Sequence, residues 1–317
     1  MIYKVIASVM VDRLFKRQSP GSVKKHNRKY IENLEKTGRH ALAETFLHAE
    51  EALDAALSEE LTVKSFDGLS LYGRYYASAA CSHITFVLLH GYKGGCARNF
   101  ILQFDALKAL GANILMIDQR AHRKSEGKYI TFGAKERYDV EEWIKLLLSR
   151  DPETKVILYG ISMGASTALI TSGLPSVKGC LCGIIADCGF TSPAEEFRHL
   201  AVYKGKRAPE KFLETGFEVT KKKADFDVNA YSTEEFAKKL SVPALFVHGA
   251  GDTFVPSYFT LRNYEACASP WKKLLIVDKA GHGGSFYHDS ERYTEELKEL
   301  YAKASETARA LSSGESL

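Results

Sequence analysis

Hydrophobic residues follow two alternating patterns along the chain from Leu61 onward. Short runs such as Ile84–Leu89 are continuously apolar or β-branched, which is typical of strands buried on both faces. Between these runs, apolar residues recur at intervals of three and four, as at Val140, Trp143 and Ile144, which predicts helices with one buried face. Strands that alternate with helices in this way predict a parallel sheet covered by helices on both sides.

The pattern predicts eight strands. They span residues 61–66, 69–76, 84–89, 113–117, 156–161, 183–187, 243–249 and 273–277. The first two flank Asp67-Gly68, a strong turn signal, so we expect them to form an antiparallel hairpin at one edge of the sheet.

The interval between the strands near 187 and 243 breaks the alternation. It is charged, aromatic and compatible with helices. We therefore expect residues 61–190 and 242–317 to form the core and residues 191–241 to form a helical cap over the carboxyl ends of the strands, with Phe212 and Phe217 facing a pocket below. The alternative is a set of ordinary surface helices packed against the sheet edge.

Residues 1–60 form a predicted N-terminal helical extension with an uneven charge. Residues 1–40 hold ten Lys or Arg and three Asp or Glu, whereas residues 41–60 hold six acidic residues and no Lys or Arg. Apolar residues in the first 14 positions fall at helical spacing, but the stretch is too short to span a bilayer. We expect this helix to dock on the rest of the chain or on a partner subunit. A basic amphipathic helix resting on an anionic membrane is the alternative.

One segment carries recognisable chemistry. The apolar run that starts at Val156 leads directly into Gly160-Ile161-Ser162-Met163-Gly164 and then into small helix formers. A serine on so tight a strand-to-helix turn has strained backbone angles, and glycines on either side let the strand and the helix approach each other. The turn exposes the serine hydroxyl at the carboxyl edge of the sheet, beside the N–H groups of the helix N-terminus. Ser162 is the predicted nucleophile.

A serine hydroxyl needs a base to take its proton and an acid to orient that base. On such a turn the partners follow in the order serine, acid, histidine. Asp252 lies in the loop after the strand 243–249, and His282 lies in a glycine-rich loop after the strand 273–277. The other histidine beyond Asp252 is His288, which stands at the start of a helical pattern, so we assign the base to His282.

Two backbone N–H groups are expected to hold the oxyanion. One belongs to Met163, the residue after the nucleophile, and the other to Tyr92, which follows His90-Gly91 after the strand 84–89. His90 is expected to brace this loop by hydrogen bonds rather than to react.

These segments together resemble the α/β-hydrolase superfamily from about Leu61 to the last helix, and within it the bacterial dienelactone-hydrolase and prolyl-oligopeptidase-type catalytic domains. The matching pieces are His90-Gly91-Tyr92, Asp118-Gln119-Arg120, Gly160-Ile161-Ser162-Met163-Gly164, Asp187-Cys188-Gly189-Phe190, Gly251-Asp252 and Gly281-His282-Gly283. The resemblance implies a mostly parallel eight-stranded sheet with helices on both faces and a helical cap insertion.

The chain departs from this pattern after Arg120. Similar enzymes read Asp-x-Arg-Gly-x-Gly-x-Ser there, whereas Ala121 and Arg123 fill both glycine positions in this chain. Any positive backbone dihedral used by relatives is therefore expected to be costly or absent. The loop with His122 and Lys124 is expected to be a solvated basic loop, and the alternative is that it lines an entrance to the site.

Composition supports a single enzyme domain without bound metal. A chain of 317 residues with 45% hydrophobic content can bury a large core. The six cysteines include no Cys-x-x-Cys pair and the histidines have no metal-ligand spacing, so we expect reduced thiols, no metal, no cofactor and a cytoplasmic location. The basic residues lack interleaved aromatics, which argues against nucleic acid as a partner.

The sequence thus predicts a serine hydrolase that cleaves carboxylic esters of small to medium size through an acyl-enzyme. Ser162, His282 and Asp252 form the predicted triad, and Tyr92 and Met163 form the predicted oxyanion hole. A serine peptidase or amidase acting on short peptides is the first alternative. A non-catalytic binding module on the same fold is the second.

Overall fold

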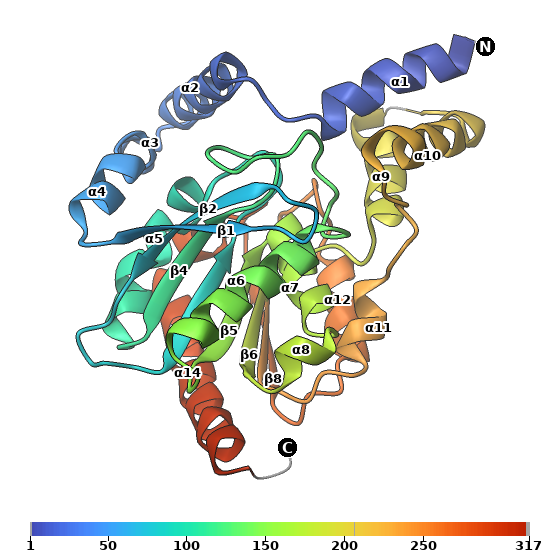
Figure 1. Ribbon diagram of the computed structural model, residues 1–317. Helices are drawn as coiled ribbons and strands as arrows, with labels where there is room; N and C mark the ends of the chain where they lie inside the picture. Colours follow the sequence, from blue (N-terminus) through green and yellow to red (C-terminus); the bar gives the residue numbers. More distant parts are fainter. Residues whose placement is uncertain (1, 206, 315–317) are drawn as a thin grey trace.

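The computed structural model describes residues 2–205 and 207–314. Its centre is an eight-stranded sheet with the strand order β1-β2-β4-β3-β5-β6-β7-β8 (Figure 1). The strands are β1 (Glu59–Lys64), β2 (Ser70–Tyr76), β3 (Ile84–Leu89), β4 (Asn113–Asp118), β5 (Lys155–Ile161), β6 (Leu181–Asp187), β7 (Ala244–Gly249) and β8 (Lys272–Val277).

Strand directions follow the prediction. β2 pairs in antiparallel fashion with β1 and with β4, and every other neighbouring pair is parallel. The turn between β1 and β2 contains Gly68 at φ 87°, a left-handed conformation that glycine adopts without strain. The predicted mostly parallel sheet with a hairpin at one edge is confirmed.

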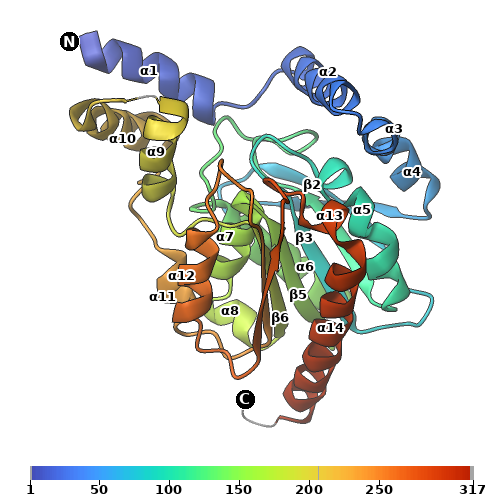
Figure 2. The ribbon, with the colours of Figure 1, turned by 180° about the vertical axis from the view of Figure 1, so that it is seen from behind.

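Helices cover both faces of the sheet (Figures 1 and 2). One face carries α5 (Cys96–Ala109), α13 (Ser285–His288) and α14 (Ser290–Ser313), and the other carries α6 (Glu136–Arg150), α7 (Met163–Thr171), α8 (Pro175–Lys178), α11 (Thr233–Ala237) and α12 (Tyr258–Ala266). Each face has its own buried apolar cluster, because the strand side chains alternate between the two sides.

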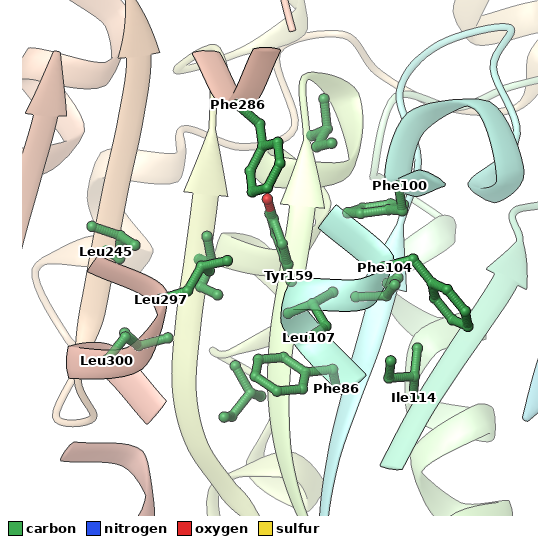
Figure 3. Packing of buried hydrophobic residues seen from close by; sticks show 14 of the residues in the cluster. Phe86, Phe100, Phe104, Leu107, Ile114, Tyr159, Leu245, Phe286, Leu297 and Leu300 are labelled. Carbon is green, nitrogen blue, oxygen red and sulfur yellow. The ribbon is translucent and has the colours of Figure 1, made fainter. Parts of the chain in front are cut away.

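The larger cluster lies between the sheet and the helices α5 and α14. Figure 3 shows Tyr159 of β5 with Phe100 and Leu107 of α5 on one side and Leu297 of α14 on the other. The Tyr159 hydroxyl is buried and lies 2.6 Å from the hydroxyl of Tyr293, so the polar end of this core residue is satisfied.

The N-terminal extension consists of α1 (Ile2–Phe15), α2 (Pro20–Lys36), α3 (His40–Leu47) and α4 (Ala49–Ala55). α4 is joined to the sheet by ion pairs from Arg74 of β2 to Glu50 and Asp54. The first helix packs along α10 (Glu210–Ala224), far from it in sequence (Figure 1). The first helix therefore docks on this chain, which is the first of the two interpretations given for it above.

The interval 191–241 holds α9 (Pro193–Val202), the short 3-10 helix η1 (Tyr203–Gly205), α10 and α11. Figures 1 and 2 show α9 and α10 beside α1, beyond the end of the sheet. By contrast, α11 packs against α7 and α12 on the sheet. The helices that project from the core in this interval are therefore α9 and α10, and the last part of the interval packs on the core.

No helix in the described residues is both long enough and apolar enough to cross a bilayer. The first helix, where the apolar stretch lies, has 14 residues.

Candidate active site

Ser162 stands alone between a strand and a helix. β5 ends at Ile161 and α7 begins at Met163, and Ser162 has φ 58° and ψ −120°, a strained conformation for a residue with a side chain. A Cβ on Gly164 would lie 1.9 Å from the carbonyl oxygen of Leu89, and one on Gly160 would lie 2.1 Å from the backbone of Gly164. Neither position has room for a side chain, so the two glycines let β3, β5 and α7 converge at the serine.

The structure brings the three predicted side chains of the triad into one hydrogen-bonded row. His282 Nε2 lies 2.9 Å from Ser162 Oγ, and His282 Nδ1 lies 2.7 Å from Asp252 Oδ2. Because a carboxylate accepts, Nδ1 must donate, which leaves Nε2 free to accept the serine proton. Asp252 follows β7 and His282 follows β8, so two successive strand ends supply the acid and the base.

Asp252 is buried and surrounded by donors. Its Oδ1 accepts hydrogen bonds from the backbone N–H groups of Phe254 and Val255, both at 3.0 Å, and its Oδ2 lies 3.2 Å from His248 Nε2. Burial alone would raise the pKa of the Asp252 carboxyl, but the hydrogen bonds from His248 and His282 outweigh it and hold that pKa well below its usual value. The carboxylate is therefore charged at neutral pH and orients His282.

His248 is a site residue that the sequence analysis missed. It is fully buried, its Nδ1 lies 2.7 Å from the hydroxyl of Thr260, and its Nε2 lies 2.8 Å from the carbonyl oxygen of Val255. It steadies both Asp252 and the loop that carries it. Its place four residues before the acid, at the end of the same strand, was the available signal.

The predicted oxyanion residues lie beside the serine. Gly91 is so close to Ser162 that a Cβ on it would lie 3.2 Å from the serine Cβ and 3.7 Å from Oγ. The next peptide N–H belongs to Tyr92. Within the described residues, the backbone hydrogen bonds outside regular helices and strands include none donated by Tyr92 or by Met163, the first residue of α7. Both N–H groups are thus available to a ligand at Ser162.

Two buried histidines brace this loop. His90 Nδ1 donates to the carbonyl of Gly91 at 2.8 Å while Nε2 accepts from the N–H of Gln119 at 3.1 Å. His122 Nδ1 likewise donates to the carbonyl of Arg120, and its Nε2 accepts from the N–H of Lys93 at 3.0 Å. Burial lowers the pKa of both rings, that of His122 to about 4, so both are neutral. The bracing role predicted for His90 is present in the structure.

The segment after Arg120 differs from both expectations. His122 is buried rather than solvated or at an entrance, Arg123 pairs with Glu50, and Lys124 pairs with Glu60 at 2.7 Å. Ala121 has φ 61° and Arg123 has φ 42°. The positive dihedrals are therefore kept without glycine, because Arg17, Glu50 and the His122 contacts hold the segment in place.

An aromatic cluster lies beside the candidate oxyanion hole, next to Met163. Phe132 is its centre, with ring centroids 5.1 Å from Tyr92, 5.0 Å from Phe197 of α9 and 5.5 Å from Phe15 of α1. Phe217 of α10 belongs to the same buried cluster. Phe212 instead packs on Tyr3 of α1, with ring centroids 5.9 Å apart, so the two phenylalanines expected to face a pocket have different surroundings.

Metal binding has little support here. In the described residues, one group of three potential ligands lies within 4.8 Å, formed by Cys188, Asp252 and His282. Burial raises the pKa of the Cys188 thiol well above its usual value, which disfavours the thiolate that a metal requires. The other two side chains are hydrogen-bonded to each other, so this donor set suits acid–base chemistry better than a metal ion.

Glu196 of α9 is a buried carboxyl without a partner. It is 3% exposed, and neither of its oxygens has a hydrogen-bond partner in the described residues. Burial, together with the negative charge of Asp252, raises the pKa of Glu196 to about 9. A neutral acid thus lies close enough to Asp252 to be influenced by its charge, a feature that no sequence pattern indicated.

Comparisons with known proteins bear on the fold and on the class of protein. A family model described as serine aminopeptidase, S33, matches residues 81–217, a range that includes Ser162 but neither Asp252 nor His282. The protein YqkD of Bacillus subtilis is 27% identical over 249 residues, which cover 76% of this chain and 80% of YqkD.

Solved structures share the fold. The esterase Pf2001 of Pyrococcus furiosus has a TM-score of 0.63 and 25% identity, and the match covers 78% of this chain and 93% of the esterase. Est1E of Butyrivibrio proteoclasticus, solved with ferulic acid bound, has a TM-score of 0.60 and 18% identity over 77% of this chain and 98% of its own. The chain shares the α/β-hydrolase fold with these esterases, and the family model together with these structures supports a hydrolase.

Gly164→Ala is expected to destabilise the fold by about 3 kcal/mol or more, because the new Cβ would overlap the Leu89 carbonyl. Gly216→Ala in α10 is the matched control, since no atom lies within 4 Å of where the new Cβ would be. Alanine in a helix should raise the free energy of unfolding by about 0.5–1 kcal/mol relative to glycine. Thermal or urea unfolding measures both, and equal stability of the two variants would contradict the close approach.

Glu196→Gln is expected to make the protein more stable than the wild type at pH 7 to 9. Because the pKa of Glu196 is about 9 in the folded protein and near 4.5 in the unfolded chain, ionisation of the unfolded chain lowers the wild-type stability as the pH rises between these values. The difference in Tm between variant and wild type should therefore grow from pH 5 to pH 9. A difference independent of pH would show that the carboxyl ionises normally.

Proposed function

We propose that this hydrolase is a serine esterase that cleaves carboxylic esters of small to medium size. The observation that carries the proposal is the continuous row from Ser162 Oγ through both nitrogens of His282 to Asp252. An imidazole held in one tautomer by a charged carboxylate, with its other nitrogen on a serine hydroxyl, is the arrangement that general-base activation of serine requires.

In the proposed reaction, His282 Nε2 takes the proton of Ser162 as Oγ attacks the ester carbonyl. The N–H groups of Tyr92 and Met163 donate hydrogen bonds to the carbonyl oxygen and stabilise the negative charge that develops on it. His282 then gives the proton to the departing alkoxide, which leaves an acyl group on Ser162. Water attacks this acyl-enzyme with His282 again as base, and the acid is released.

Exposure differs between the two ends of the candidate site. Ser162 is 7% exposed, whereas the side chain of His282 is 26% exposed, with the ring of Phe254 5.1 Å away. The leaving group would thus depart on the open side, past His282. The acyl group would lie toward Tyr92 and Phe132, where aromatic side chains offer an apolar surface. The esterases among the solved relatives share this fold.

A serine peptidase acting on short peptides is the second candidate. The description of the matching family model as a serine aminopeptidase favours it. An amine is a poorer leaving group than an alkoxide, so peptide cleavage demands that His282 protonate the leaving nitrogen efficiently.

Ser162→Ala is expected to abolish labelling of the protein by a fluorophosphonate probe, because the probe phosphonylates the Oγ atom that alanine lacks. Ser166→Ala is the matched control, since Ser166 lies one turn further along α7 and its hydroxyl is bonded to the backbone of Phe190. In-gel fluorescence measures labelling. A Ser162→Ala protein that is folded and still labelled would place the nucleophile elsewhere.

Hydrolysis of p-nitrophenyl esters is expected to exceed hydrolysis of aminoacyl p-nitroanilides. In the same assay, Asp252→Asn is expected to lower kcat for the esters by roughly 10⁴, because His282 would no longer be held in the tautomer that accepts the serine proton. Asp278→Asn, an exposed acid after β8, should leave kcat unchanged. Steady-state rates at saturating substrate measure both. Faster anilide turnover would favour the peptidase, and full activity of Asp252→Asn would contradict the triad.

A further inference from the structure

The outer side of α1 carries an unusual amount of exposed apolar surface. Val5 and Val9 are 60% and 65% exposed. They share the helix with four further large apolar side chains that are exposed in the same segment, namely Tyr3, Ile6, Met10 and Leu14. Successive positions of this kind on a single helix form a continuous apolar surface rather than scattered surface residues.

The inner side of the same helix is firmly held. Ala7, Val11 and Phe15 are buried, and Phe15 packs in the aromatic cluster around Phe132. Lys223 of α10 pairs with Asp12 at 2.7 Å. This chain covers one side of α1 and leaves the apolar side chains on the other side exposed. The exposed side chains therefore belong to an anchored helix and not to a loose end.

Basic residues surround this apolar surface. Lys4, Arg13 and Lys16 are exposed on or next to α1, and the acidic residue of that helix, Asp12, is paired with Lys223. The neighbouring helix α2 exposes Lys24, Lys25, Arg28 and Lys29. Of the α2 residues named here, Arg28 has an ion pair, with Glu32 at 3.4 Å, whereas the described residues offer no ion-pair partner to Lys24, Lys25 or Lys29.

Both helices lie along one edge of the molecule. In Figures 1 and 2, which view it from opposite sides, α1 and α2 run across the top, and α14 lies toward the bottom. We call the exposed sides of α1 and α2 the N-terminal face. It combines projecting apolar side chains with a surplus of positive charge at the edge of the molecule, where a broad flat partner can approach without meeting the rest of the chain.

We propose that the N-terminal face docks on an anionic lipid bilayer, with α1 lying in the plane of the interface. The apolar side chains would enter the acyl-chain boundary, and the lysines of α1 and α2 would meet the lipid phosphates. A helix of 14 residues is too short to span the bilayer, so the protein would rest on it. A second copy of this chain fits less well, because pairing two such faces would bring like charges together.

Sedimentation of the full chain with vesicles tests this proposal. The expected result is strong binding to vesicles of equimolar phosphatidylglycerol and phosphatidylcholine, weak binding to phosphatidylcholine alone, and release by salt. Val5→Ser combined with Val9→Ser should lower the bound fraction severalfold, and because both side chains are largely exposed the thermal unfolding of the protein should not change. Leu57→Ser is the matched apolar control, since Leu57 is 97% exposed away from α1.

Charge is tested in the same assay. Lys24→Gln combined with Lys25→Gln should weaken binding roughly fivefold for each lysine removed. Lys298→Gln combined with Lys303→Gln removes the same net charge from α14 and should have little effect. Equal binding to both kinds of vesicle, or equal effects of the two lysine pairs, would overturn the proposal. So would a dimer in solution that dissociates in the Val5→Ser, Val9→Ser protein while vesicles remain unbound.

Discussion

The close approach of α7 to the end of β3 is the constraint on which the rest of the site depends. Only glycine fits where Gly164 meets the Leu89 carbonyl, and the same tight turn forces Ser162 into its strained backbone conformation. The N–H of Ser162 donates to the carbonyl of Asp187 at 2.7 Å, which ties the turn to β6. Strain at one residue is thus balanced by packing around it, and the hydroxyl is held toward His282 and Gly91.

The candidate site combines a charged carboxylate with two neutral histidine rings. Asp252 stays ionised because four donors surround it, whereas burial keeps the rings of His90 and His122 neutral. Neutral rings can both donate and accept, which is what bracing a backbone loop demands. Charged rings would have donated at both nitrogens and left the N–H groups of Gln119 and Lys93 without acceptors. The pKa shifts and the hydrogen bonds therefore describe the same arrangement.

Much of this organisation was readable in the sequence because it depends on local rules. Buried strands, a glycine-flanked serine and the order of acid and base along the chain each leave a short pattern, and the structure brings Ser162, Asp252 and His282 together accordingly. The sequence did not predict features that arise from contacts between distant segments. Ala121 and Arg123 keep positive φ angles because the N-terminal helices hold them, and Glu196 is buried because α9 packs near the Asp252 loop.

The link between α1 and the loop that follows β3 has a practical consequence. The hydroxyl of Tyr92 donates to the carbonyl of Leu14, and the Lys93 ammonium donates to the carbonyl of Arg13 at 2.8 Å. Trimming the protein to the segment that resembles its relatives would remove both acceptors and uncover the ring of Phe132. A shortened enzyme would therefore differ from the intact one at its reaction centre, and its kinetics would not report on the native molecule.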